Sequence, residues 1–153
     1  MFHPSSLRPI ELSGSNLHFV VDNIGNSEIR QSTIHGYGLF ATQCVAEGDE
    51  LAVLDGQVVT WASFDAFRQA KLYGQDGDDL CMEWNALSVD VLLVRPFRTK
   101  YSFINHSRTP SLRLENRPLR LIAVRAITAG EEFTLDYRCE PLKDSYLQEA
   151  KYL

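Results

Sequence analysis

The chain has 153 residues, of which 44% are apolar and 23% are charged, with nine glycines, six prolines and a formal net charge of −5. This composition is typical of one globular domain with its own core, and it excludes a disordered tail, a collagen-like rod and a low-complexity linker. Because neither a run of 18 uncharged apolar residues nor an apolar N-terminal run is present, we expect no transmembrane helix, no secretory signal and a cytoplasmic protein, or a nuclear one in a eukaryotic cell.

The charges are unevenly distributed along the chain. Residues 47–94 carry ten acidic and two basic side chains, whereas residues 95–127 carry eight basic and one acidic. Such asymmetry indicates either a patch for a charged partner or charges that scatter over a solvated surface after folding. The three cysteines form no CxxC pair, so we expect reduced, partly buried thiols at Cys44, Cys81 and Cys139.

The N-terminal third predicts strands and turns. Residues 1–15 are typical of an extended arm or a flexible lead-in. Residues 17–21 and 28–30 are strand-like and are separated by turn residues, which predicts a hairpin. Further strands are expected at residues 39–42, 50–54 and 58–59, with Asp55-Gly56 as a hairpin turn between the last two.

The middle of the chain predicts one amphipathic helix. Apolar side chains recur at helical spacing between residues 60 and 73, with Thr60 or Ser63 as the N-cap and Gly74 at the end. The positions that carry this spacing are Trp61, Phe64, Phe67 and Leu72.

The C-terminal half predicts short strands and a final helix. Strand-like runs cover residues 80–87, 89–95, 111–115, 119–125 and 133–137, and a helix is expected over residues 143–152. Asn116-Arg117-Pro118 is typical of a hairpin turn between the third and fourth runs. Many short strands and two helices indicate an irregular, mainly β fold.

Three polar or glycine-rich clusters are not explained by folding alone. In the first, Gly36-Tyr37-Gly38 precedes a strand, where glycines permit positive φ and close approach of a ligand, although a tight turn is the simpler interpretation. In the second, Asn105-His106-Ser107 follows an apolar strand and lines either a crevice or a capping turn. His106 has the chemistry of a general base, but no nucleophile lies in a hydrolase context. The third cluster is residues 130–137, Gly-Glu-Glu-Phe-Thr-Leu-Asp-Tyr.

Taken together and in this order, the clusters resemble the SET-domain protein lysine methyltransferases over about residues 29–138. The resemblance implies a mainly β SET-domain β-clip fold with few helices, small sheets and a threaded, pseudoknotted C-terminal region. It implies an N-terminal arm and first strand (residues 1–28), a SET domain (29–138) with a variable insert (60–96), and a C-terminal helix (139–153) that closes the lysine channel.

The resemblance also implies a site that binds S-adenosylmethionine. Tyr137 takes the place of the catalytic tyrosine, and Leu135, Asp136 and Tyr146 are expected along the substrate channel. Arg108 stands where many members carry a zinc-binding cysteine, so we expect no metal. The cofactor-binding residues implied are His35, Gly36, Tyr37, Gly38, Tyr101, Asn105 and His106.

The implied substrate is a basic protein: a histone, a histone-like protein or a ribosomal protein tail. The acidic residues 47–94 would attract such a substrate. A catalytically weak SET-like module that binds peptide or cofactor is the alternative. Residues 95–125 would serve a nucleic-acid binder, but no reader motif is present and we expect no direct nucleic-acid binding. The chain is expected to act as a monomer or a homodimer, away from membranes.

Overall fold

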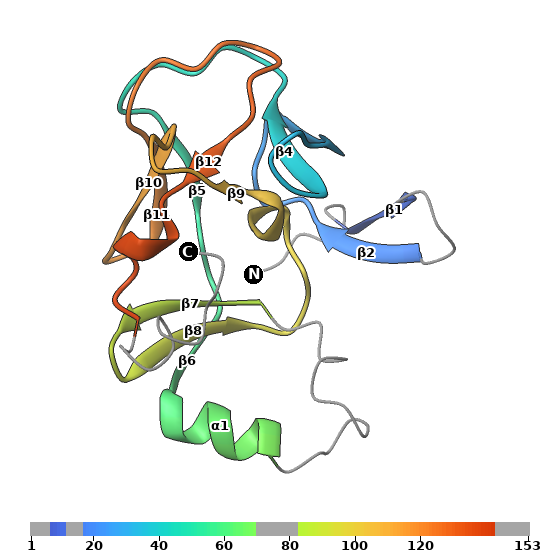
Figure 1. Ribbon diagram of the computed structural model, residues 1–153. Helices are drawn as coiled ribbons and strands as arrows, with labels where there is room; N and C mark the ends of the chain where they lie inside the picture. The colour runs from blue at the N-terminus through green and yellow to red at the C-terminus, as the bar shows by residue number, and fades with distance from the viewer. Residues whose placement is uncertain (1–6, 12–16, 70–82, 143–153) are drawn as a thin grey trace. The chain divides into compact units, whose positions relative to one another are not determined.

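The computed structural model describes residues 7–11, 17–69 and 83–142 (Figure 1). The chain divides into two units: Met1–Leu54 with Phe97–Tyr137, and Asp55–Pro96 with Arg138–Leu153. In both units most of the regular secondary structure of the described residues consists of short strands in small sheets, which confirms the mainly β fold. No helix in the described part of the chain is long and apolar enough to cross a membrane.

Among its described residues, the first unit contains four small sheets and two 3₁₀ turns. Its sheets pair β1 (Leu7–Glu11) with β2 (Leu17–Val21), β3 (Ser27–Gln31) with β4 (Tyr37–Ala41), β11 (Arg120–Ala123) with both β10 (Leu112–Glu115) and β5 (Glu50–Val53), and β9 (Asn105–His106) with β12 (Thr134–Leu135). The 3₁₀ turns are η3 (Lys100–Phe103) and η4 (Tyr137–Cys139), the second of which continues into the other unit. Its most deeply buried side chains include Ile24, Leu39, Ile104, Leu112, Leu121, Ile127 and Phe133.

The part of the second unit that the structure describes forms a three-stranded antiparallel sheet and one helix. The strand order is β6 (Gln57–Thr60), β8 (Val91–Arg95), β7 (Glu83–Ser88), and α1 (Trp61–Gln69) follows β6 directly. Thr60 is the N-cap, since its hydroxyl accepts the Ser63 N–H at 3.1 Å. The predicted helix and cap are thus confirmed as far as Gln69, and its expected end at Gly74 lies outside the described residues.

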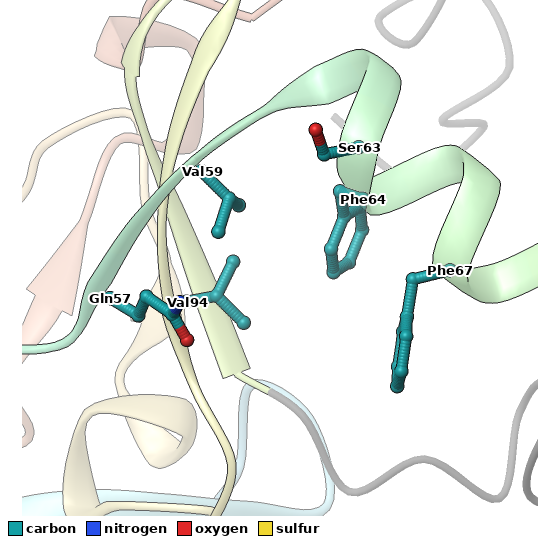
Figure 2. A pocket seen from close by; sticks show the side chains of 6 residues that line it. All are labelled: Gln57, Val59, Ser63, Phe64, Phe67 and Val94. Atoms are coloured by element: carbon teal, nitrogen blue, oxygen red, sulfur yellow. The ribbon is translucent and has the colours of Figure 1, made fainter.

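Apolar side chains of α1 and the sheet form the core of this unit. Trp61, Phe64, Ala86, Leu92 and Val94 are buried together. A hollow of about 220 Å³ lies beside this core, where Val59 and Val94 of the strands face Phe64 and Phe67 of the helix (Figure 2). None of the three sequence clusters contributes a lining residue to the hollow.

The predicted hairpin between residues 17–21 and 28–30 is wrong. Strand β2 pairs with β1, in the segment expected to be an arm, and β3 pairs with β4. The loop between β2 and β3 curls around the buried Lys100 ammonium, which lies 2.6 Å from the Asp22 carboxylate and donates to the carbonyls of Ile24 and Ser27. A loop that encloses a cation cannot be the tight turn of a hairpin.

The Asp55-Gly56 hairpin is also wrong, because β5 pairs with β11 whereas β6 pairs with β8. At Gly56 the chain passes so close to β8 that a Cβ atom would lie 2.7 Å from the Val94 carbonyl oxygen. The glycine therefore serves a close backbone approach. By contrast, the β10–β11 hairpin is confirmed, with a cis peptide bond between Arg117 and Pro118.

Cys44 and Cys139 are free and exposed, so the expectation of partly buried thiols is wrong for these two. Cys81 and the predicted C-terminal helix over residues 143–152 lie outside the described residues. The threaded crossing expected for the C-terminal region stays a prediction.

Candidate active site

The second and third sequence clusters meet in a two-stranded parallel sheet. Strand β9 lies beside β12 (Figure 1). In their parallel register, Asn105 pairs with Thr134 and His106 pairs with Leu135. The Ser107 N–H continues this ladder by donating to the Leu135 carbonyl at 2.9 Å. Sequence patterns indicated the third cluster as a strand, whereas the strand at Asn105 was missed because two residues are too few to show a period.

A reciprocal pair of hydrogen bonds fixes β12 from its other side. The Thr134 N–H donates to the Ser111 hydroxyl at 2.9 Å, and the Ser111 N–H donates to the Thr134 hydroxyl at 3.1 Å. Both residues are buried, so the loss of either hydroxyl would leave a backbone donor without a partner. The strand that leads into Asp136 and Tyr137 is therefore held on two sides.

The Asn105 side chain connects these strands to the first cluster. Its amide nitrogen donates to the carbonyl oxygens of His35 at 3.2 Å and Tyr37 at 3.3 Å. Gly36, between them, has a φ of +48°, which confirms the positive φ expected of a glycine at this position. One side chain thus holds the backbone on both sides of Gly36.

Glu132 completes this connection, and sequence reasoning assigned it no role. Its carboxylate accepts the Asn105 amide at 2.7 Å and the Ser32 hydroxyl at 2.9 Å. The same carboxylate covers Gly38, where an added Cβ would lie 2.1 Å from Glu132 Oε1. The group that approaches this glycine is therefore a carboxylate of the protein itself. Phe40 forms an isolated bridge with Glu132, which sets this register.

Tyr137 is oriented by two contacts from the second cluster. Its hydroxyl donates a short hydrogen bond to the carbonyl oxygen of Ile104, and its backbone N–H donates to Nδ1 of His106 at 3.2 Å. The two rings lie 5.3 Å apart between centroids. Because His106 Nδ1 accepts this backbone proton, the neutral ring carries its own proton on Nε2. This arrangement makes His106 a support for Tyr137 and does not favour the general-base hypothesis.

The remaining site residues differ in exposure. His35 and Gly36 are exposed, whereas Leu135 and Tyr101 are buried, the latter in η3. The carboxylate of Asp136 is 3.9 Å from His106 Nδ1.

Of the sequence-predicted residues, the structure brings Asn105 into contact with the backbone of His35 and Tyr37, and His106 into contact with Tyr137. Tyr146 lies outside the described residues.

Comparison with known proteins agrees with this geometry. The chain is 24% identical over 136 residues to a protein of Arabidopsis thaliana named histone-lysine N-methyltransferase MEDEA, and the matched part is 84% of this chain. It spans only 19% of the length of that relative. The SET-domain family model matches residues 36–138, from Gly36 to the residue after Tyr137. Since this match covers more than half of the chain, the resemblance is confirmed, and the chain belongs to the SET-domain family.

Proposed function

We propose that this chain is a protein lysine N-methyltransferase that uses S-adenosylmethionine and acts on a basic protein. The observation that carries the proposal is the side chain of Asn105, which joins the Gly36 loop to Glu132 directly beside the strand that leads to Tyr137. The three sequence clusters that carry the resemblance to the family are thus joined by hydrogen bonds. Family membership and the name of the Arabidopsis relative give independent support.

The residues around Asn105 fit the amino-acid end of the proposed cofactor. The hydrogen bonds of the Asn105 side chain to His35, Tyr37 and Glu132 all use its amide nitrogen, which points that nitrogen into the protein and leaves the Oδ1 oxygen as an acceptor. An ammonium group is a pure donor and suits such an oxygen. His35 and Gly36 are exposed beside it, so a ligand can reach this edge. When bound there, S-adenosylmethionine would supply an electrophilic methyl group on its sulfonium sulfur, which a neutral amine can accept as the C–S bond breaks and the thioether leaves.

Tyr137 would orient the amine of the substrate lysine. Its hydroxyl has one proton and donates it to the Ile104 carbonyl, so toward a substrate the hydroxyl oxygen acts as an acceptor. A lysine with a pKa of about 10.4 is neutral about once in 2,500 at pH 7, which costs about 4.6 kcal/mol. Desolvation of the ammonium lowers this cost because burial disfavours the charged form. Tyr137 then contributes by accepting an N–H of the amine, which directs the nitrogen lone pair toward the methyl group, a contribution of positioning and electrostatics.

The basic substrate is supported by exposed carboxylates in the acidic stretch of residues 47–94 and by the name of the relative. In the described part of residues 47–94, side chains such as Asp55, Asp65 and Asp90 are exposed. Histones, histone-like proteins and ribosomal protein tails are rich in lysine and arginine, and opposite charge steers such chains to this surface.

Transfer of a labelled methyl group from S-adenosylmethionine to histones and ribosomal proteins tests the proposal, with Tyr137→Phe as the matched variant. We expect wild-type transfer, and a loss of about 10²- to 10³-fold in kcat for Tyr137→Phe with an unchanged Kd for the cofactor. Retained cofactor and peptide binding with no transfer by the wild-type protein would contradict the enzyme and favour the binding module.

A further inference from the structure

Strand β6 is an open edge of the sheet in the second unit, because it pairs with β8 alone. Alternate residues of an edge strand direct their N–H and C=O groups away from the sheet. Among the described residues, no backbone hydrogen bond joins residues 57–59 to a segment other than β8. The strand has the sequence Gln-Val-Val-Thr and a regular register, so it lacks the charge, proline or bulge that commonly keeps a further strand away. This edge can therefore accept one.

The hollow beside α1 reaches the surface at this edge. The exposed side chains of Gln57 and Ser63 form its rim, and the buried Phe64 and Val94 form its floor (Figure 2). Gln57 and Val59 lie two residues apart, so they share one face of β6. A strand added to β6 would direct alternate side chains to the same face, and therefore into the hollow.

The size and lining of the hollow suit a side chain better than a metabolite. Its volume is about 220 Å³. Pockets for small molecules span roughly 300–1,000 Å³, whereas a water molecule occupies about 30 Å³ of the liquid. The deeper lining, from Val59, Phe64, Phe67 and Val94, is apolar. An aliphatic side chain thus matches the hollow in both size and polarity.

Exposed aspartates lie near both ends of β6. Asp55 precedes the strand by two residues, and the Asp90 carbonyl accepts the N–H of Trp61, directly after the strand, at 3.0 Å. Of the exposed charged side chains that the structure describes in residues 55–67 and 83–96, all are acidic. This charge favours lysine or arginine at both ends of an added strand. It disfavours pairing with β6 of a second copy, whose aspartates would repel those of the first.

We propose that β6 and the hollow form a docking site for an extended, basic segment of a partner protein. The segment adds to β6 as a further strand, places one aliphatic side chain in the hollow and carries lysine or arginine toward Asp55 and Asp90. Backbone hydrogen bonds supply affinity in this mode of recognition, and the pocket supplies specificity. The site consists of residues of the second unit alone and requires neither Tyr137 nor a cofactor.

Peptides without lysine test the docking separately from methyl transfer. The probes are fluorescent peptides Arg-Arg-Thr-X-Thr-Arg-Arg, in which X is leucine, isoleucine, valine or glycine, and fluorescence anisotropy gives their Kd. We expect the best aliphatic peptide to bind at least tenfold more tightly than the glycine peptide, because only the former fills the hollow. Hydrogen exchange should slow at residues 57–60 when this peptide is bound. N-methylation of alternate peptide residues should abolish binding in one of its two patterns, since a strand uses alternate N–H groups.

Variants of the protein locate the site. Ser63→Phe fills the hollow from its rim and should weaken binding of the best peptide at least tenfold. Ala62→Phe is the matched control, because it adds the same side chain at an exposed position of α1 that does not line the hollow. Gln57→Phe fills the hollow from β6 and should act like Ser63→Phe, which covers the case in which a substitution near the N-cap unfolds α1. Thermal unfolding shows which variants remain folded.

The charge of the site is tested by Asp55→Asn, which should weaken binding about two- to fivefold at low salt. Glu47→Gln is its control, because it removes an exposed carboxylate of the first unit and should change the Kd less.

Three results would overturn the proposal. The first is that none of the peptides binds the wild-type protein. The second is that the folded variants with a filled hollow bind as tightly as Ala62→Phe. The third is self-association of the wild-type protein with protection of residues 57–60 that Ser63→Phe removes, which would make a second copy the occupant. None of these results depends on methyl transfer, so the proposed function stands or fails separately.

Discussion

At the scale of single residues, position 38 needs a glycine because a neighbouring side chain leaves no room for a Cβ atom. The backbone conformation of Gly38 does not itself require a glycine. Its φ is not in the left-handed region, unlike that of Gly36, yet a Cβ at Gly38 would lie 2.1 Å from Glu132 Oε1 and 3.1 Å from the Ser32 Cβ. The Glu132 carboxylate cannot retreat without leaving Asn105, to which it is bound at 2.7 Å. A methyl group at this position would therefore disturb the hydrogen bonds that surround Asn105.

We predict that Gly38→Ala destabilises the protein by about 1–3 kcal/mol, because it displaces a partly buried, hydrogen-bonded carboxylate. Cofactor affinity should fall as well, since Asn105 loses its partner. Gly25→Ala is the control, because a Cβ there meets nothing within 4 Å. Denaturant unfolding and cofactor titration measure both effects. Equal unfolding free energies for the two alanine variants would contradict this account.

Glu132 is predicted to set the orientation of the Asn105 amide. In Glu132→Ala the amide loses its carboxylate acceptor, and we expect a cofactor Kd about tenfold higher, consistent with the loss of one charge-assisted hydrogen bond. Glu132→Gln keeps one oxygen acceptor and should recover most of the affinity. In a Glu132→Ala background, Gly38→Ala should cost little additional stability, since the clashing atoms are absent. Titration calorimetry gives the Kd values, and equal values for the Ala and Gln variants would refute the orienting role.

The motif residues of this site were predictable from the sequence, whereas the hydrogen bonds among them were not. Asn105, Tyr137 and the two glycines stand in a recognisable order. The role of Glu132 depends on partners 27 and 100 positions away, at Asn105 and Ser32. Periodic patterns in the sequence cannot predict contacts between residues so far apart. The contact of the Glu132 carboxylate with Gly38 arises only in the folded chain, where β4 forms a bridge with residue 132.

At the scale of elements, the turn that precedes Glu132 is closed by an ion pair. The Glu131 carboxylate accepts the Arg125 guanidinium and the Thr128 N–H, the latter at 3.2 Å. The hydrogen bond from Arg125 lowers the pKa of Glu131, with a smaller contribution from Thr128 and some opposition from burial, and the same pair raises the pKa of Arg125. A carboxylate whose pKa is lower in the folded protein stabilises the fold above its unfolded pKa.

We therefore predict that the stability difference between wild type and Arg125→Gln is constant near neutral pH and disappears as pH falls from about 4.5 through the lowered pKa of Glu131. The difference should be at most about 1 kcal/mol, because the Arg125 side chain is 47% exposed. Unfolding at several pH values measures it. In a Glu131→Gln background the Arg125 substitution should have no pH-dependent effect, and a difference that grows toward acid would contradict the prediction.

Elements formed by neighbouring residues were predicted correctly from the sequence, whereas pairings between distant strands were not. Hydrophobic period and turn residues indicated the β10–β11 hairpin and α1 correctly, because both are made of residues adjacent in the chain. The partners of β2 and β5 were predicted wrongly, because strand pairing depends on distant groups. Lys100 lies 76 positions from Ile24, whose carbonyl it binds, and it also contacts Asp22 and Ser27 of the loop after β2.

At the scale of the whole molecule, ion pairs compensate much of the positive charge that the sequence concentrates in residues 95–127. Five of the eight basic residues in the stretch 95–127 form ion pairs with carboxylates, and these are Arg95, Lys100, Arg113, Arg120 and Arg125. Their charge is therefore largely compensated, which weakens the nucleic-acid hypothesis. In the acidic stretch, by contrast, Asp55 and Asp65 are exposed with no ion pair among the described residues.

A net charge of −5 with exposed carboxylates predicts that the substrate is captured electrostatically. We expect the KM of a lysine- and arginine-rich peptide to rise several-fold between about 50 and about 300 mM salt, because the Debye length shortens over this range, while kcat stays constant. A peptide with the same target lysine and its flanking arginines replaced by glutamine should have a higher KM that no longer depends on salt. A KM that is independent of salt for the basic peptide would show that the acidic surface is only a solvated face. Since kcat reports Tyr137 and KM reports the surface, the two effects are separable in one set of initial rates.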